Sequence, residues 1–189
     1  MIDARDVTPA EILTFWREAG YERWYTRNTA FDDEVRRQFL GLWRKAAAGE
    51  LSSWESSDDG VLALVIILDQ FPRNMFRDDI QTYSSDAQAR EVARRAIAHG
   101  IDRRIEAALL EFLYMPFMHS EHPADQQFCV ELFRKAGHAE KLGAENLGYA
   151  EDHADIIRRF GRFPHRNRTL GRTTTPEEQA FLDNGGFSG

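Results

Sequence analysis

The sequence contains one cysteine, six prolines and no long apolar run, and these scarcities exclude several classes of protein. With Cys129 alone, no intramolecular disulfide can form, which indicates a reducing compartment. Cys129 lies in the apolar helical pattern QFCVELF, so we expect a buried structural thiol. No stretch reaches the roughly 20 apolar residues of a membrane span, and the first residues show no apolar signal region. We therefore expect a cytoplasmic protein with no membrane partner.

Positive charge is also scarce, because 24 lysines and arginines stand against 31 aspartates and glutamates. The net charge of −7 argues against a nucleic-acid partner, since such a protein needs a positive surface to displace phosphate counterions. The exception is the stretch Arg158–Arg172, with six arginines and no acidic residue. A chain of 189 residues that is 42% hydrophobic and holds thirteen Phe can bury one sizeable core. We predict a single helical domain over residues 1–189, with a loose tail from about residue 184.

Helix start and stop signals predict an all-α fold of about eight helices. Three segments read as capping boxes: Thr8–Glu11, Ser85–Gln88 and Thr175–Glu178. The expected helices cover about residues 9–19, 32–49, 57–69, 86–99, 105–117, 123–133, 146–160 and 176–184. Because the connections are short and no strand pattern is present, these helices should stack as helical hairpins.

The central element is the apolar run Val61–Leu68, which periodicity alone cannot assign to helix or buried strand. No second strand-like run exists with which it could pair. We therefore predict a helix that is apolar on all sides, from about Ser57 to Asp69. Pro72 should stop this helix and bias Phe71 towards an extended conformation.

Polar side chains gather in four short segments at the ends of apolar helices, where a helical stack would form a pocket. The segments are DQFPRN from Asp69, YMPFMHSEHPADQ from Tyr114, EDHADIIRRF from Glu151 and GRFPHRNRTLGR from Gly161. A carboxylate at the C-terminal end of a helix is unfavourable unless a cation pairs with it. The structural interpretation of the first segment therefore pairs Asp69 with Arg73 or with an arginine of the basic stretch.

The histidines of the second and third segments suggest different chemistry. His119 and His122 lie three residues apart on a non-helical turn, which fixes no metal-ligand geometry, so we predict no metal site and no cofactor. His153 precedes Ile156 and Ile157 on a helical stripe and should face the core. A lone inward histidine is ordinarily a satisfied core group, but near carboxylates it can also act as a general acid or base.

The fourth segment alternates arginines with Phe163, His165 and Asn167. Arginine forks suit carboxylate or phosphate groups, which favours an anion site on a folded loop. The same segment, which we call the basic arm (Gly161–Arg172), could instead neutralise the acidic remainder of its own protein. RNA is a third reading, which the overall acidity weakens.

Three long blocks carry a resemblance to a known family. The blocks are LALVIILDQFPRNMFR, FLYMPFMHSE with ADQ, and HADIIRRFGRFPHRNRTLGRTTTPEE. They resemble the bacterial family catalogued as domain of unknown function 924, over most of the chain from the Trp16 helix to Leu182. The resemblance implies an all-helical fold similar to tetratricopeptide-type hairpin stacks, and it implies no activity.

Three functional hypotheses stay open at this point. The first is a pocket for a small anionic ligand, which either only binds the ligand or also transforms it. Its candidate acid–base groups are Asp69, His119, Glu121 and His153. Its candidate ligand-binding groups are Arg73, Asn74, Asp125, Arg162, His165, Arg166 and Asn167.

The second hypothesis is a protein- or peptide-binding module, marked by an exposed apolar or Asn/Lys-lined concave face outside the three long blocks named above. The third is a buried salt-bridge network that specifies the fold. In addition, we expect the two Phe-Pro turns to lie near each other, with Phe71 and Phe163 in or beside the core. The neighbouring arginines should then face Asp69, Glu121 or Asp125.

Overall fold

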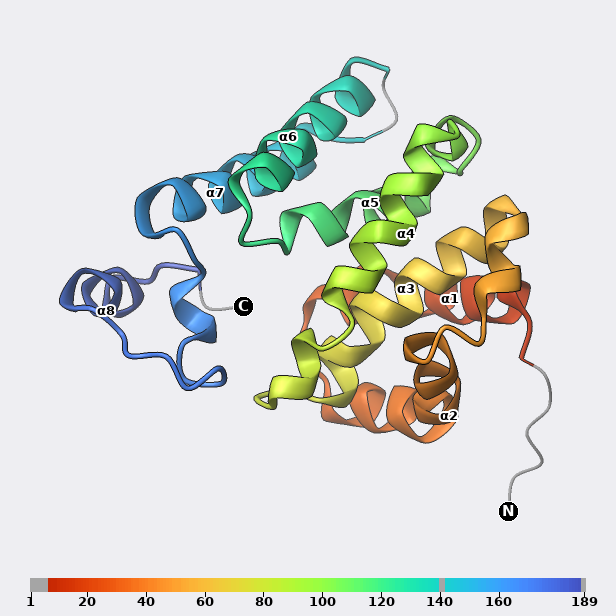
Figure 1. The fold of residues 1–189 in the computed structure, drawn as a ribbon, viewed down its shortest axis with the longest axis horizontal. Helices are drawn as coiled ribbons and strands as arrows, with labels where there is room; N and C mark the ends of the chain where they lie inside the picture. The colour runs from red at the N-terminus through yellow and green to blue at the C-terminus, as the bar shows by residue number, and fades with distance from the viewer. Residues whose placement is uncertain (1–6, 140–141, 188–189) are drawn as a thin grey trace. The chain divides into compact units, whose positions relative to one another are not determined.

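The computed structural model describes residues 7–139 and 142–187, and these contain eight α-helices, four short 3-10 helices and no strand (Figure 1). The α-helices are α1 (Pro9–Tyr25), α2 (Thr29–Ala47), α3 (Asp58–Met75), α4 (Asp86–Ala98), α5 (Ala107–Met118), α6 (Pro123–His138), α7 (Ala144–Phe160) and α8 (Pro176–Asp183). The 3-10 helices are η1 (Ser52–Ser56), η2 (Ile80–Tyr83), η3 (Ile101–Arg103) and η4 (Pro164–Arg166). The predicted all-α class is confirmed.

The chain divides into two compact units. Unit 1 holds the chain up to Arg77 together with Gln81–Pro116, and unit 2 holds Asp78–Ile80 together with the chain from Phe117 onward. The boundary therefore falls within α5. The expectation of a single domain stays a prediction, and each unit is described by itself.

Unit 1 is built around α3, which packs against α1, α2, α4 and η1. Every residue of Val61–Leu68 is buried, so the predicted central helix, apolar on all sides, is confirmed. Phe71 is fully buried, as expected. Its ring stacks on Phe39 at a centroid distance of 5.0 Å and lies 5.7 Å from the Trp16 ring. Such aromatic pairs stabilise a core beyond the area that they bury.

The prediction that Pro72 stops α3 is wrong, because the helix continues to Met75. Proline lacks the N–H that would bond to the carbonyl four residues earlier, here that of Leu68. The Ser85 hydroxyl donates to this carbonyl instead, at 2.6 Å, and accepts a bond from Trp43 Nε1 at 3.1 Å. A side chain from outside the helix therefore satisfies the group that Pro72 leaves without a donor.

Two of the three predicted capping boxes are present, at Thr8–Glu11 and at Thr175–Glu178. The third prediction is wrong, because the Ser85 side chain makes no capping hydrogen bond to the start of α4. Its hydroxyl donates to the Leu68 carbonyl instead. The predicted end of α1 at Gly20 is a break rather than an end. Gly20 has φ of 72°, a left-handed conformation that glycine adopts at little cost, and the chain resumes helical structure to Tyr25.

Unit 2 consists mainly of the pair α6 and α7, together with η4 and α8. Its apolar cluster contains Ile156, Ile157 and Phe163, against which Phe160 and Phe181 pack. Phe163 is fully buried, as expected for the second Phe-Pro turn. In the predicted loose tail, Phe187 is 41% exposed and its ring contacts two histidines, while residues 188–189 lie outside the described part of the chain. The looseness of this tail stays a prediction.

We expect Gly60→Ala to destabilise unit 1. A Cβ at Gly60 would lie 2.1 Å from the Trp54 carbonyl oxygen, so η1 would have to move away from the start of α3. Overpacking of this kind costs about 1–3 kcal/mol. Gly41 in α2 is the matched control, because a Cβ there meets no atom within 4 Å and alanine should stabilise the helix by about 0.5–1 kcal/mol. Urea unfolding of both variants measures the difference, and equal stabilities would contradict the expectation.

Candidate functional site

The first predicted polar segment forms an ion-pair cluster in unit 1. Asp69 is fully buried on α3, and Arg73 follows one helical turn later. Arg73 Nη1 lies 3.5 Å from Asp69 Oδ1 and donates at 2.9 Å to Asp86 Oδ1, while Nη2 donates at 3.1 Å to Asp86 Oδ2. Burial alone would lower the pKa of Arg73, but the two carboxylates outweigh it and raise the pKa. The predicted pairing of Asp69 with Arg73 is therefore confirmed, and Asp86 is an additional partner.

Asn74, one residue beyond Arg73, joins α3 to the start of α2. Its side-chain amide donates at 2.8 Å to Asp32 Oδ1, and Arg77 donates to both oxygens of the same carboxylate. Asn74 and Arg73 thus lie on the helix itself rather than on a turn beyond it. Both of these predicted ligand-binding residues therefore donate to carboxylates of unit 1, Arg73 to Asp86 and Asn74 to Asp32.

In unit 2, Glu121 is the centre of a second cluster. Its carboxylate accepts the backbone N–H of Phe163 at 2.9 Å and both Nη atoms of Arg172 at 2.8 Å. Burial alone would raise the pKa of Glu121, but these bonds and the charge of Arg166 lower it. Part of the basic arm therefore faces Glu121, as predicted.

Glu178 organises the other part of the arm. The carboxylate accepts bonds from Arg162 Nε at 2.6 Å, Arg162 Nη2 at 2.9 Å and Asn167 Nδ2 at 3.1 Å. It also caps α8 by accepting the backbone N–H of Thr175 at 2.8 Å. The Arg162 bonds, helped by Thr175 and Asn167, lower the pKa of Glu178 to about 2. Sequence reasoning missed Glu178 as a partner and used it only as a helix cap.

Three further predicted residues of unit 2, His153, His165 and Arg166, contact Phe163. The rings of His153 and His165 each lie 5.6 Å from the Phe163 ring, and the Arg166 guanidinium lies over it at 4.6 Å. Phe187 contacts both histidine rings, at 4.5 and 5.1 Å. His153 is buried, as the helical stripe predicted.

Hydrogen bonds in unit 2 occupy some polar atoms of the predicted site residues. His153 Nδ1 lies 2.7 Å from the Tyr149 carbonyl, so in the neutral ring Nδ1 carries the proton and Nε2 is the basic nitrogen. The Ser120 hydroxyl donates at 2.7 Å to Asp125 in the first turn of α6. His119 is half-buried in the segment between α5 and α6.

The candidate residues therefore fall into two sets. Asp69, Arg73 and Asn74 lie in unit 1, and the others lie in unit 2. The structure pairs Arg73, Arg162 and Asn167 with carboxylates of their own unit. The catalytic and ligand-binding roles of these residues, and the proximity of the two Phe-Pro turns, stay predictions.

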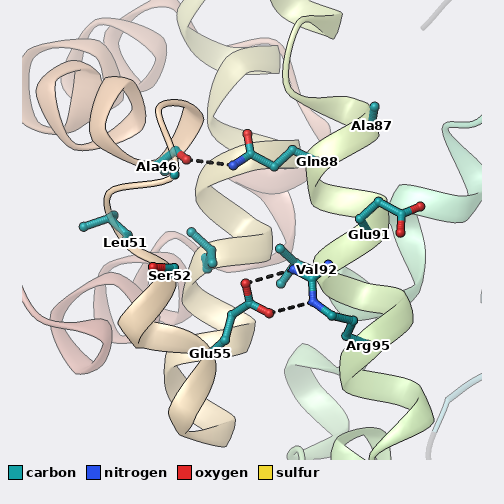
Figure 2. A pocket seen from close by; sticks show the side chains of 11 residues that line it. Ala46, Leu51, Ser52, Glu55, Ala87, Gln88, Glu91, Val92 and Arg95 are labelled. Carbon is teal, nitrogen blue, oxygen red and sulfur yellow. Dashed lines mark hydrogen bonds and ion pairs between the residues drawn. The ribbon is translucent and has the colours of Figure 1, made fainter.

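Two adjoining cavities in unit 1 lie outside all four polar segments. The first, of about 310 Å³, is lined by α2, η1, α3, α4 and the connection after α2 (Figure 2). The second, of about 260 Å³, lies beside it along η1, α3, α4 and η3. Both are lined by Glu55 and Arg95, which form an ion pair with two bonds of 2.9 Å. Sequence reasoning missed this surface, and the sequence offers no signal for it, because lining residues such as Ala46, Gly49 and Ala87 come from separate segments.

Neither cavity is accompanied by metal-binding chemistry. Within residues 7–139 and 142–187, no group of three or more His, Cys, Asp or Glu side chains is placed to hold a metal ion. In the same part of the chain, no helix is long and apolar enough to cross a bilayer.

The helices and their arginine–carboxylate clusters define an all-α protein without strands in its described residues. The chain belongs to the bacterial family of proteins of unknown function DUF924, whose model matches residues 12–186. It is 42% identical to a solved structure, the protein of unknown function ATU0120 from Agrobacterium tumefaciens, with a TM-score of 0.88 over 94% of this chain and 97% of that one. No curated protein matches the chain. The resemblance inferred from the three sequence blocks is confirmed.

Proposed function

We propose that this protein is a peptide-binding module that holds an extended segment of a partner protein in unit 1. The binding surface is formed by the two adjoining cavities, which we call the groove. The observation that carries the proposal is that both cavities are lined by Glu55 and Arg95, so the two depressions adjoin each other at this ion pair. A concave face outside the three long sequence blocks is the feature that distinguishes a binding module from the other two hypotheses, and the lining residues other than Leu64 lie outside those blocks.

The lining of the groove supports a segment that places side chains in depressions. Leu64 and Val92 are buried side chains that face the first cavity, and Val61 and Ala96 contribute in the same way to the second. Each cavity has at most the lower end of the volume of small-molecule sites, which is roughly 300 Å³. Two small depressions side by side suit alternate side chains of an extended segment, which point to the same face, better than one compact ligand.

Polar groups along the groove are arranged to fix such a segment. In Figure 2, Gln88 of α4 reaches across to the carbonyl of Ala46, with a bond of 2.9 Å, and Arg95 reaches across to Glu55 of η1. Polar groups of this kind provide orientation, while the apolar floor provides most of the affinity.

The ion-pair clusters favour this proposal over an anion pocket at the arginine arm. Arg162 and Arg172 each donate two bonds to a carboxylate of unit 2, so an anionic ligand would have to displace Glu178 or Glu121. Removing one partner from such a pair is costly, because it leaves the other charge unsatisfied. The clusters are therefore best explained as structural networks that hold the basic arm and α8 in place. The buried Cys129 thiol supports a reducing compartment such as the cytoplasm.

The test is a selection from a random-peptide display library, followed by affinity measurement with purified protein. Ala87 is exposed and lines the groove, and Ala87→Trp should fill the first cavity. Ala108→Trp is the matched control, because Ala108 is also exposed, is also the second residue of its helix, and lies outside the groove. We expect selected peptides to lose at least about tenfold in affinity for Ala87→Trp and to bind Ala108→Trp normally. Equal binding to both variants, or no selected peptide, would overturn the proposal.

A further inference from the structure

Two polar side chains of α4 line the groove and carry hydrogen-bonding groups that the fold does not use. Gln88 is half-buried and donates its amide N–H to the Ala46 carbonyl, but its amide oxygen accepts no bond within residues 7–139 and 142–187. The Arg95 side chain is 51% exposed and donates one N–H each from Nε and Nη2 to Glu55. Because a guanidinium carries five N–H donors, the Nη1 group and the second N–H of Nη2 are not engaged by Glu55. Gln88 can therefore still accept a bond, and Arg95 can still donate one.

The spacing of these two side chains matches the backbone of an extended segment. Gln88 and Arg95 are seven residues apart and lie two turns apart on the same side of α4 (Figure 2). Seven residues of α-helix rise about 10.5 Å. Three residues of extended chain cover about 10 Å, and the N–H of the first residue and the C=O of the third lie on the same edge of such a stretch. The helix thus presents an acceptor and a donor at the separation of one backbone N–H and one backbone C=O.

We infer that Gln88 and Arg95 clamp the main chain of the bound segment over three consecutive residues. The Gln88 amide oxygen accepts the N–H of the first residue, and the Arg95 guanidinium donates to the C=O of the third while it remains bonded to Glu55. This inference rests on the proposed function, and it adds the positioning residues and the register of the segment.

The clamp is consistent with the two depressions of the groove. The side chains of the first and third residues of an extended stretch point to the same face, so they can enter the two depressions, which adjoin each other at Arg95. The side chain of the middle residue points to the opposite face. The groove therefore recognises an extended main chain with apolar residues at alternate positions and tolerates many residues between them.

The test is an N-methyl scan of the tightest peptide from the display selection, synthesised with a fluorescein label. Each version carries one methyl group on one backbone nitrogen, which removes a single N–H donor. Fluorescence anisotropy measures the affinities for the full wild-type chain and for Gln88→Met, which lacks the acceptor. This variant should fold, because the Ala46 carbonyl keeps its bond from the Gly49 N–H at 2.9 Å. Gln38→Met is the matched control, since Gln38 is also a helical glutamine of unit 1 with one side-chain bond, to Glu34, and does not line the groove.

We expect methylation at one apolar anchor residue to weaken binding to the wild-type chain and to Gln38→Met by about threefold to tenfold, the effect of one hydrogen bond. Gln88→Met should bind the methylated and unmethylated peptides alike. Methylation of the middle residue should affect all three proteins equally, because its N–H points to the opposite edge. Arg95→Lys keeps a positive charge beside Glu55 but loses the planar fork, so it should weaken every peptide by a similar factor.

The outcomes separate this inference from the proposed function. If Ala87→Trp abolishes binding but no methylated position depends on Gln88, the groove stands and the clamp is wrong. Unchanged affinities with Arg95→Lys would overturn the donor half of the clamp. If the selection yields no peptide, or if Ala87→Trp leaves binding unchanged, the proposed function fails and the clamp fails with it.

Discussion

Replacing Arg73 by methionine is expected to lower the free energy of unfolding by about 3–5 kcal/mol. The guanidinium bridges Asp69, whose side chain is fully buried, and Asp86, whose side chain is 11% exposed. Methionine keeps most of the side-chain volume but removes the positive charge that Arg73 places between these two carboxylates. Two neighbouring acids would then share a dry environment, which is unfavourable for both. Urea unfolding at neutral pH measures the loss.

Arg17 provides the comparison that separates burial from charge. It also pairs with a carboxylate of unit 1, Glu106, but the two side chains are 48% and 47% exposed. Exposed pairs contribute about 0–1 kcal/mol, so Arg17→Met should change stability little. If the two variants were equally stable, the cluster at Asp69 would not be the structural network that we describe.

The prediction of the helices from sequence succeeded where the signals are local. The capping boxes at Thr8 and Thr175 involve residues within one turn, and their hydrogen bonds form wherever the helix forms. The run Val61–Leu68 could be assigned to a helix because the sequence shows no second strand-like run with which it could pair. The pairing of Asp69 with Arg73 was also local, since residues four apart lie on the same face of a helix.

The errors arose where distant residues override local preference. Pro72 is a strong stop signal, yet α3 continues, and the Leu68 carbonyl is satisfied by Ser85, which lies 17 residues beyond Leu68 in the sequence. The same contact removes Ser85 from its expected role as a helix cap. Neither outcome is visible without the packing of Trp43 against Ser85, which only the folded chain brings about.

The candidate site could be predicted only in part, for a related reason. The charge pattern alone predicted that the basic arm would form ion pairs with acidic residues elsewhere in the chain. Arg172 does pair with Glu121, which lies 51 residues away. Charge could not select Glu178 for Arg162 or Asp86 for Arg73, because several carboxylates compete and their distances are set by the fold. The groove was missed entirely. Its residues, such as Ala46, Glu55 and Val92, form no sequence motif and become a surface only when α2, η1 and α4 meet over α3.

The Glu178 cluster is expected to make the stability of unit 2 depend on pH. The folded pKa of Glu178 is about 2, below its ordinary value of 4.5, because Arg162, Thr175 and Asn167 donate to the ionised carboxylate. A depressed folded pKa stabilises the fold fully above the unfolded pKa, and this contribution is lost as pH falls through the folded value. The loss should therefore occur between about pH 5 and pH 2 and amount to about 2–3 kcal/mol.

Glu178→Gln should remove this contribution and lower stability at pH 7 by a similar amount, since the amide cannot accept the Arg162 fork as a charge. The difference between variant and wild type should shrink steadily on acidification, because the wild-type carboxylate becomes neutral as well. Urea unfolding from pH 7 to pH 2.5, with hydrogen exchange at the α8 amides, follows both effects. Glu177→Gln is the control, since Glu177 is exposed in the same turn and should leave stability within about 0.5 kcal/mol. A constant difference in unfolding free energy between Glu178→Gln and wild type across this pH range would contradict the prediction. It would show that Glu178 stabilises unit 2 through packing and not through its charge.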